Sequence, residues 1–262
     1  MRPRIITAFA AATAAAALLA GCGQLGGAAG GAATATTAPA SAQEKLAAAV
    51  PDTSAGRYAF SFKDATSSTD GVVDAASRKL SMTTAYKEVE AGFTLTMSYL
   101  VVDKDQWVKI SFDKQLPGMP KLPKTWLRLD QSKIKDDPFT NLDDPDPVGA
   151  GALVDAIVEV SEAEPGTFAG TLDLTKATEA SVVDDDGLEA LGAKATAVPF
   201  TATLDDAGRL ATIDIKVPAY AKVEAFTHHS TYDKYGSAPE VRAPAANASQ
   251  DAPAAAYELL NS

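Results

Sequence analysis

Apolar and polar residues alternate along much of the chain between residues 57 and 112. Alternation with a period of two is typical of β-strands that bury one face. The clearest run extends from Phe93 to Val101, with Thr94, Thr96 and Ser98 at the intervening positions. Similar runs lie around 58–62, 72–73, 80–86 and 108–112, separated by turn residues, and we expect one of the turns at 67–71. The pattern predicts an antiparallel meander with one apolar and one polar face.

Outside these runs the pattern predicts helices, further strands and loops. A short helix is expected at 41–50, with Ser41 as its N-cap and Glu44 three residues later. An apolar stripe predicts a second helix over 148–160, and 175–191 is expected to be helical in pieces, broken at 184–187. Strands are predicted at 126–129, 167–174, 198–204, 210–217 and 223–232, and a long surface loop at 131–147. Helices segregated from an antiparallel sheet define an α+β fold.

The N-terminal segment has the organisation of a bacterial signal peptide. Arg2 and Arg4 precede an apolar run that ends in Leu18-Leu19-Ala20-Gly21-Cys22. This ending matches the lipobox, the pattern at which lipoprotein precursors are cleaved and lipidated. We therefore expect residues 1–21 to be removed between Gly21 and Cys22, and Cys22, the only cysteine, to carry the acyl chains. The mature protein is then predicted to work outside the cytoplasm, anchored to the outer face of the cell membrane.

The composition after Cys22 predicts the domain organisation. Residues 22–42 are rich in Gly, Ala and Thr and carry no charge, which is typical of a flexible tether. Residues 43–242 are expected to form a single lipoprotein domain. Residues 243–256 are rich in Ala and Pro, and we expect 243–262 to be a C-terminal tail that is partly helical over 257–262.

Charge and composition argue against several classes of function. The formal net charge is −11, so the protein should repel the phosphates of nucleic acids. An acidic protein is also not held on an anionic membrane by charge, and the acyl chains would have to anchor it. Hydrophobic residues make up 46% of the chain but aromatic residues only 7%, so a core with modest aromatic filling is expected.

No residue pattern indicates catalysis, a metal or a cofactor, and we do not expect an enzyme. The two histidines, His228 and His229, are adjacent, and adjacent side chains on a strand point to opposite faces, which disfavours joint chelation. The acidic stretches 143–146 and 184–187 lack the alternating spacing of a calcium loop, and solvated loops are the simpler interpretation.

The order of several short pieces resembles one known family. These pieces are a strand, an Asp/Gly turn and a return strand at 198–210, then Tyr232-Asp233-Lys234-Tyr235-Gly236, Pro239-Glu240-Val241 and Ala243-Pro244-Ala245. Together with Trp126-Leu127-Arg128-Leu129 and the lipobox, they look like the LppX/LprG-type actinobacterial lipoproteins over residues 42–250. The resemblance implies a curved antiparallel half-barrel of the LolA/LppX type with helices packed on its concave face. It also implies an apolar cavity that holds acyl chains of lipids or glycolipids.

Two functions from different classes follow. The first is a monomeric, membrane-anchored carrier of lipids or lipoglycans, whose ligand-binding residues the sequence does not identify. The alternative is a non-enzymatic interaction or sensor lipoprotein that uses the same scaffold as a docking surface. In that case the acidic residues Asp143, Asp144 and Asp146 would make its contacts.

Overall fold

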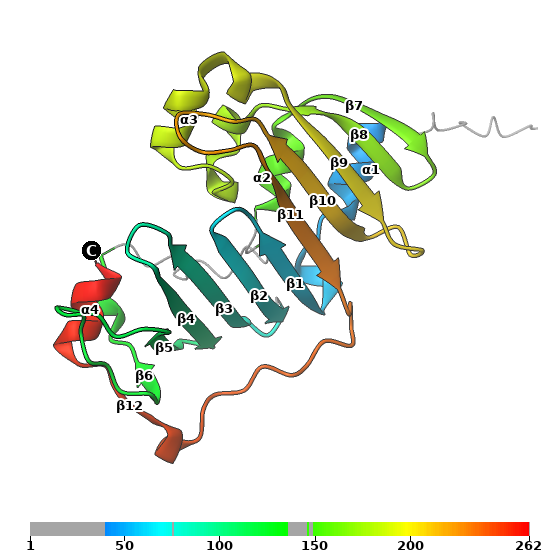
Figure 1. Ribbon diagram of the computed structural model, residues 1–262. Helices are drawn as coiled ribbons and strands as arrows, with labels where there is room; N and C mark the ends of the chain where they lie inside the picture. Colours follow the sequence, from blue (N-terminus) through cyan, green and yellow to red (C-terminus); the bar gives the residue numbers. More distant parts are fainter. Residues whose placement is uncertain (1–39, 75, 136–145, 147–148, 262) are drawn as a thin grey trace, which may run out of the picture. The chain divides into compact units, whose positions relative to one another are not determined.

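The computed structural model describes residues 40–74, 76–135, 146 and 149–261 (Figure 1). The predicted signal peptide, the cleavage position at Gly21 and Cys22, and nearly all of the predicted tether lie outside the described residues. So do Asp143 and Asp144. The compact unit that contains the described residues begins at Ala40.

A twelve-stranded sheet forms most of this unit, with few helices, which confirms the α+β class. The strand order across the sheet is β12-β6-β5-β4-β3-β2-β1-β11-β10-β9-β8-β7, so the sheet is open, with β12 and β7 at its edges. All neighbours are antiparallel except β12 and β6. The strands are β1 (Arg57–Lys63), β2 (Ser67–Asp74), β3 (Lys79–Glu88), β4 (Phe93–Val102), β5 (Asp105–Phe112), β6 (Trp126–Arg128), β7 (Ile157–Glu164), β8 (Thr167–Leu172), β9 (Val198–Leu204), β10 (Leu210–Val217), β11 (Phe226–Asp233) and β12 (Ser249–Asp251).

The predicted meander is present as β1 to β5, but one predicted turn is wrong. Residues 67–71 belong to β2, and the turn lies before them, where the Asp64 carboxylate accepts hydrogen bonds from the backbone N–H groups of Thr66 and Ser67. Thr69 is buried within β2, and its hydroxyl forms a hydrogen bond of 2.8 Å with the hydroxyl of Thr84 on β3. A polar run resembles a turn in sequence, yet it can form a strand when its hydroxyls are paired across the sheet.

The first helix is present, and the second is shorter than predicted. Helix α1 (Ala42–Ala49) begins at a capping box in which Ser41 and Glu44 bond reciprocally, as the sequence indicated. Helix α2 spans only Ala150–Asp155, and the predicted continuation to residue 160 is instead the start of β7. Ile157 and Val160 pair there with β8. β-Branched residues favour a pleated strand, so the local preference agrees with the pairing.

The acidic stretch 184–187 starts a helix and does not interrupt one. The Asp184 side chain accepts a hydrogen bond from the Gly187 N–H and caps helix α3 (Asp185–Leu191). Between β8 and α3 the chain forms two short 3₁₀ turns, η3 (Leu174–Lys176) and η4 (Thr178–Ala180). A third 3₁₀ segment, η5 (Gly192–Ala197), follows α3. Helical structure over 175–191 is thus in pieces, as expected.

The residues after 242 belong to the same compact unit, which extends to the C-terminus. Where we expected a tail, residues 249–251 form β12, which pairs with β6, and Ala254–Leu260 form helix α4 (Figure 1). The connecting segment after β11 contacts one face of the sheet, because Val241 packs against Leu100 and Trp107. Alanines and prolines suggested a tail, but the few large side chains among them pack against the sheet.

Two clusters of buried apolar side chains form the core on the other face of the sheet. The first joins strands of both halves of the sheet to the helices and 3₁₀ turns, through residues such as Leu46, Phe60, Leu153, Phe168 and Ile215. The second joins β5 and β6 to α4, and its buried members are Val108, Ile110, Leu127, Leu129, Ala256 and Tyr257. Helical segments therefore cover the two ends of one apolar sheet face.

Candidate functional site

The candidate site lies on this apolar face, between the two covered ends. Strand register brings side chains of β1 to β5 into rows, since directly paired residues point to the same side. One row contains Phe62, Thr69, Thr84, Met97 and Ile110. The two rows beside it contain Met82 with Tyr99, and Tyr86 with Leu95. We call the six partly exposed members Phe62, Met82, Tyr86, Leu95, Met97 and Tyr99 the apolar band.

Burial distinguishes the apolar band from the core on either side of it. Phe60 and Ile110, in the flanking clusters, are only 3% exposed. Within the apolar band, Tyr86 is 39% exposed and the other five side chains are half-buried. Phe62 and Met82 contact the first cluster, whereas Leu95, Met97 and Tyr99 contact the second. The apolar face is therefore less completely covered in the middle, where only the buried residues Thr69 and Thr84 interrupt the apolar side chains of the central row.

Polar groups beneath the apolar band are paired with one another. The hydroxyls of Thr69 and Thr84, which are 2% and 3% exposed, form the hydrogen bond described above. The Tyr99 hydroxyl donates to the Met97 sulfur at 3.4 Å. Burial raises the pKa of the Tyr86 hydroxyl, which therefore stays neutral at physiological pH. The apolar band thus carries no formal charge.

His228 lies at one end of the apolar band and is neutral. Its ring stacks on Phe62 with centroids 5.6 Å apart, and its Nε2 is 3.2 Å from the Ser230 hydroxyl. Its buried Nδ1 has no hydrogen-bond partner among the described residues. Burial lowers the pKa of His228, although the negative charge of Asp64 acts in the opposite direction. An uncharged imidazole adds a flat, weakly polar surface to the apolar band.

The two histidines point to opposite faces, as predicted. His228 is buried, whereas His229 is exposed and its Nδ1 is 2.5 Å from Asp214 Oδ1. Among the described residues, no group of three or more His, Cys, Asp or Glu side chains is placed to hold a metal ion. Of the acidic residues considered for docking, Asp146 is described. Its carboxylate accepts a hydrogen bond from the Gly151 N–H within α2, which gives it a local structural role.

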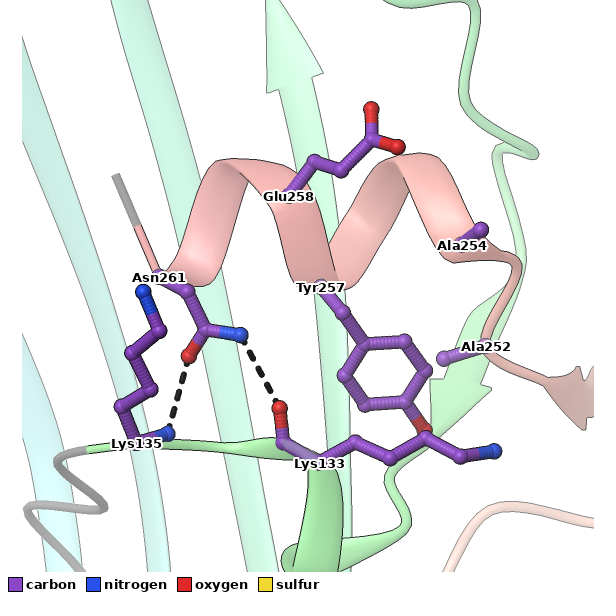
Figure 2. A pocket seen from close by; sticks show the side chains of 7 residues that line it. All are labelled: Lys133, Lys135, Ala252, Ala254, Tyr257, Glu258 and Asn261. Atoms are coloured by element: carbon purple, nitrogen blue, oxygen red, sulfur yellow. Dashed lines mark hydrogen bonds between the residues drawn. The ribbon is translucent and has the colours of Figure 1, made fainter.

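Two open surface grooves have charged residues in their lining. One of about 670 Å³ lies between α4 and residues 133–135 (Figure 2). Asn261 bridges its two sides, because its amide donates to the Lys133 carbonyl and accepts from the Lys135 N–H, each at 2.9 Å. The Lys133 ammonium lies 5.4 Å from the centroid of the Tyr257 ring. A second groove, of about 350 Å³, lies on the opposite, polar face of the sheet between β1, β2, β3 and Pro239.

Two further findings bear on classification. No family model and no curated protein sequence matches the chain. None of the helices in the described part of the chain is long and apolar enough to cross a membrane. The candidate site therefore has to be interpreted from its own chemistry.

The sequence contained the members of the apolar band but did not distinguish them. Met97 and Tyr99 alternate along β4 in the same way as buried core residues. Their spacing shows that they share a face, and it does not show how completely other elements cover that face. One signal in the sequence indicated that the last residues pack on the domain: the large apolar side chains of Tyr257, Leu259 and Leu260.

Proposed function

We propose that this protein is a membrane-anchored lipoprotein that binds acyl chains of lipids or lipoglycans on the apolar band and carries them in the cell envelope. The observation that supports it best is the apolar sheet face, whose middle is only partly covered while both ends are packed under helical segments. Partly exposed apolar surface of this kind is typical of binding sites for apolar ligands. The proposed carrier is monomeric and non-enzymatic.

The dimensions and chemistry of the apolar band suit an acyl chain. It crosses four strands, β1 to β4, and neighbouring strands are about 4.8 Å apart, so it spans about 14 Å. One leaflet of a bilayer holds acyl chains in a hydrocarbon layer about 15 Å thick. Met82 and Met97 have flexible, polarisable side chains, which adapt to ligands of varied shape. Each buried CH₂ group contributes about 0.8 kcal/mol, so covering even half of such a chain yields useful affinity.

The finer architecture belongs to the same proposal. We interpret the curved sheet as a half-barrel with the helices on its concave face, which places the apolar band inside the curve. Cys22 would hold the domain on the outer face of the membrane through its acyl chains, and the tether would let it move away from the surface. The resemblance to LppX/LprG-type lipoproteins supports this interpretation.

A direct test is native mass spectrometry of the chain from residue 22 onward, with Cys22→Ser so that it carries no acyl chain of its own. After incubation with a bacterial lipid extract, we expect complexes of one protein with one acylated lipid. Leu95→Glu should abolish them, since it places a charge in the apolar band. Thr96→Glu is the matched control, because Thr96 is the next residue on β4 and points to the opposite face.

The control must retain lipid binding, and both variants must show the same circular dichroism as the parent. Equal lipid loading of the parent and Leu95→Glu would contradict the proposed site. Absence of any bound lipid in the parent would contradict the proposed function.

A further inference from the structure

Helix α4 lies on the same sheet face as the apolar band and directly beside it. Its buried residues Ala256 and Tyr257 pack with Val108 and Ile110 on β5. Leu259 and Leu260 are partly buried in the same cluster, together with Leu95, Met97 and Tyr99 of the apolar band. The helix therefore covers apolar surface that continues into the proposed binding site.

The backbone attachment of α4 to the rest of the domain is short, although its buried side chains pack in the second cluster. The helix has seven residues, which is too short to be stable without packing. The strand before it, β12, pairs with β6 over three residues at the edge of the sheet. The connection back to β11 is fixed to the sheet at Val241, but after Val241 its only element before β12 is a short 3₁₀ turn, η6 (Ala246–Ala248).

Specific hydrogen bonds hold the C-terminal end of α4 in place. Asn261 forms the two bonds to the backbone of residues 133 and 135, which Figure 2 shows as dashed lines. The Tyr257 hydroxyl accepts a hydrogen bond of 2.8 Å from the Asp130 N–H. These bonds join α4 to residues 130–135 and not to the strands that carry the apolar band. These hydrogen bonds can therefore break without disrupting the strand pairing of the sheet.

The first apolar cluster, which joins the remaining helices to the sheet, contains no residue of α4 among its described members. Loss of the α4 contacts would therefore leave the larger part of the core intact. Local opening of a weakly attached terminal element, while the main core stays folded, is a common motion in proteins.

We propose that α4 is a movable cover, which occupies one end of the apolar face in the free protein and moves away to extend the binding surface when an acyl chain enters. This inference rests on the proposed lipid-binding function and adds a conformational step to it. In the closed state, Leu259 and Leu260 provide the apolar contacts that the ligand provides in the open state.

The test compares Asn261→Ala with the parent, both as the chain from residue 22 onward with Cys22→Ser. Hydrogen exchange measured by mass spectrometry reports opening of residues 254–260, and stopped-flow fluorescence reports the association rate of a dansyl-labelled fatty acid. The loss of two hydrogen bonds should raise the population of the open state by roughly 25-fold, since each is worth about a fivefold change. We expect faster exchange in 254–260 and a similar increase in association rate.

Two further variants serve as controls for folding and for position. Tyr257→Phe keeps the ring packed and removes one hydrogen bond, so it should change both readouts by about fivefold even if Asn261→Ala disturbs folding. Asn247→Ala, at an exposed position in η6, should change neither.

The outcomes separate this inference from the proposed function. Faster exchange in 254–260 with an unchanged association rate would refute the proposal that α4 covers the binding surface, but it would not contradict lipid binding. If the parent and all variants fail to bind the fatty acid, both the proposed function and the cover are wrong.

Discussion

The hydrogen bond between Thr69 and Thr84 offers a sharp test of the site, because it lies within the rows that form the apolar band. Both side chains are almost fully buried, and their hydroxyls are 2.8 Å apart. Valine has nearly the same shape as threonine, so Thr→Val removes the hydroxyl without leaving a large cavity. In Thr84→Val, the Thr69 hydroxyl loses this partner in a place that water reaches poorly.

Leaving a buried hydroxyl unpaired costs about 2 kcal/mol, whereas replacing both partners with apolar groups of the same shape is nearly neutral. We therefore expect each single variant to be less stable by about 2 kcal/mol and the double variant to be close to the parent. For a domain of this size, that loss lowers the melting temperature by roughly 4–8 °C. The double variant should also bind a fatty acid at least as tightly as the parent, since the surface beneath the apolar band becomes fully apolar.

Urea unfolding of the four proteins, followed by circular dichroism, measures the coupling free energy between the two hydroxyls. Thr83→Val is the control, because its bond to Ser98 lies on the opposite, half-exposed face and water can replace it. Additive losses, with the double variant about 4 kcal/mol below the parent, would refute the reasoning. So would a loss at Thr83 as large as that at Thr84.

Two other predictions follow from close packing and burial. Gly170→Ala should lower the free energy of unfolding by about 3 kcal/mol, since its Cβ would lie 1.9 Å from the Glu159 carbonyl oxygen. The control is Gly151→Ala in α2, which should be neutral or stabilising because the nearest atom to its Cβ is 3.5 Å away. Equal effects of the two substitutions in calorimetry would contradict the prediction. Because burial lowers the pKa of His228 below its usual value of 6.5, the unfolded chain binds this proton more readily, and stability should fall as the pH drops below about 6.5. Urea unfolding at several pH values should show a weaker fall in His228→Phe, and identical pH profiles would show that His228 is not responsible.

Local sequence signals predicted the elements whose causes are local. The alternation in β4 and β5, the turn between β9 and β10, and the capping box of α1 all appear as expected. The failures share a cause, since each depended on pairing with a neighbouring strand. Residues 67–71 are a strand because β1 and β3 pair with them, and 157–160 are a strand because β8 pairs with them.

The candidate site, too, could be predicted only in part from local sequence. Sequence alone determined which residues of β1 to β5 share a face, because the pleat of a strand places every second side chain on the same side. It also predicts the membrane anchor, since the lipobox pattern is contained in a few consecutive residues.

Only the tertiary structure decided which part of that face is covered and by what. The partial exposure of the apolar band depends on where α4 and the helices of the first cluster end, and of these α2, α3 and α4 are far from β1 to β5 in the sequence. Alternation specifies the direction of a side chain, but burial is a property of everything packed around it. For this reason a segment expected to be a tail became the element that lies beside the proposed binding surface.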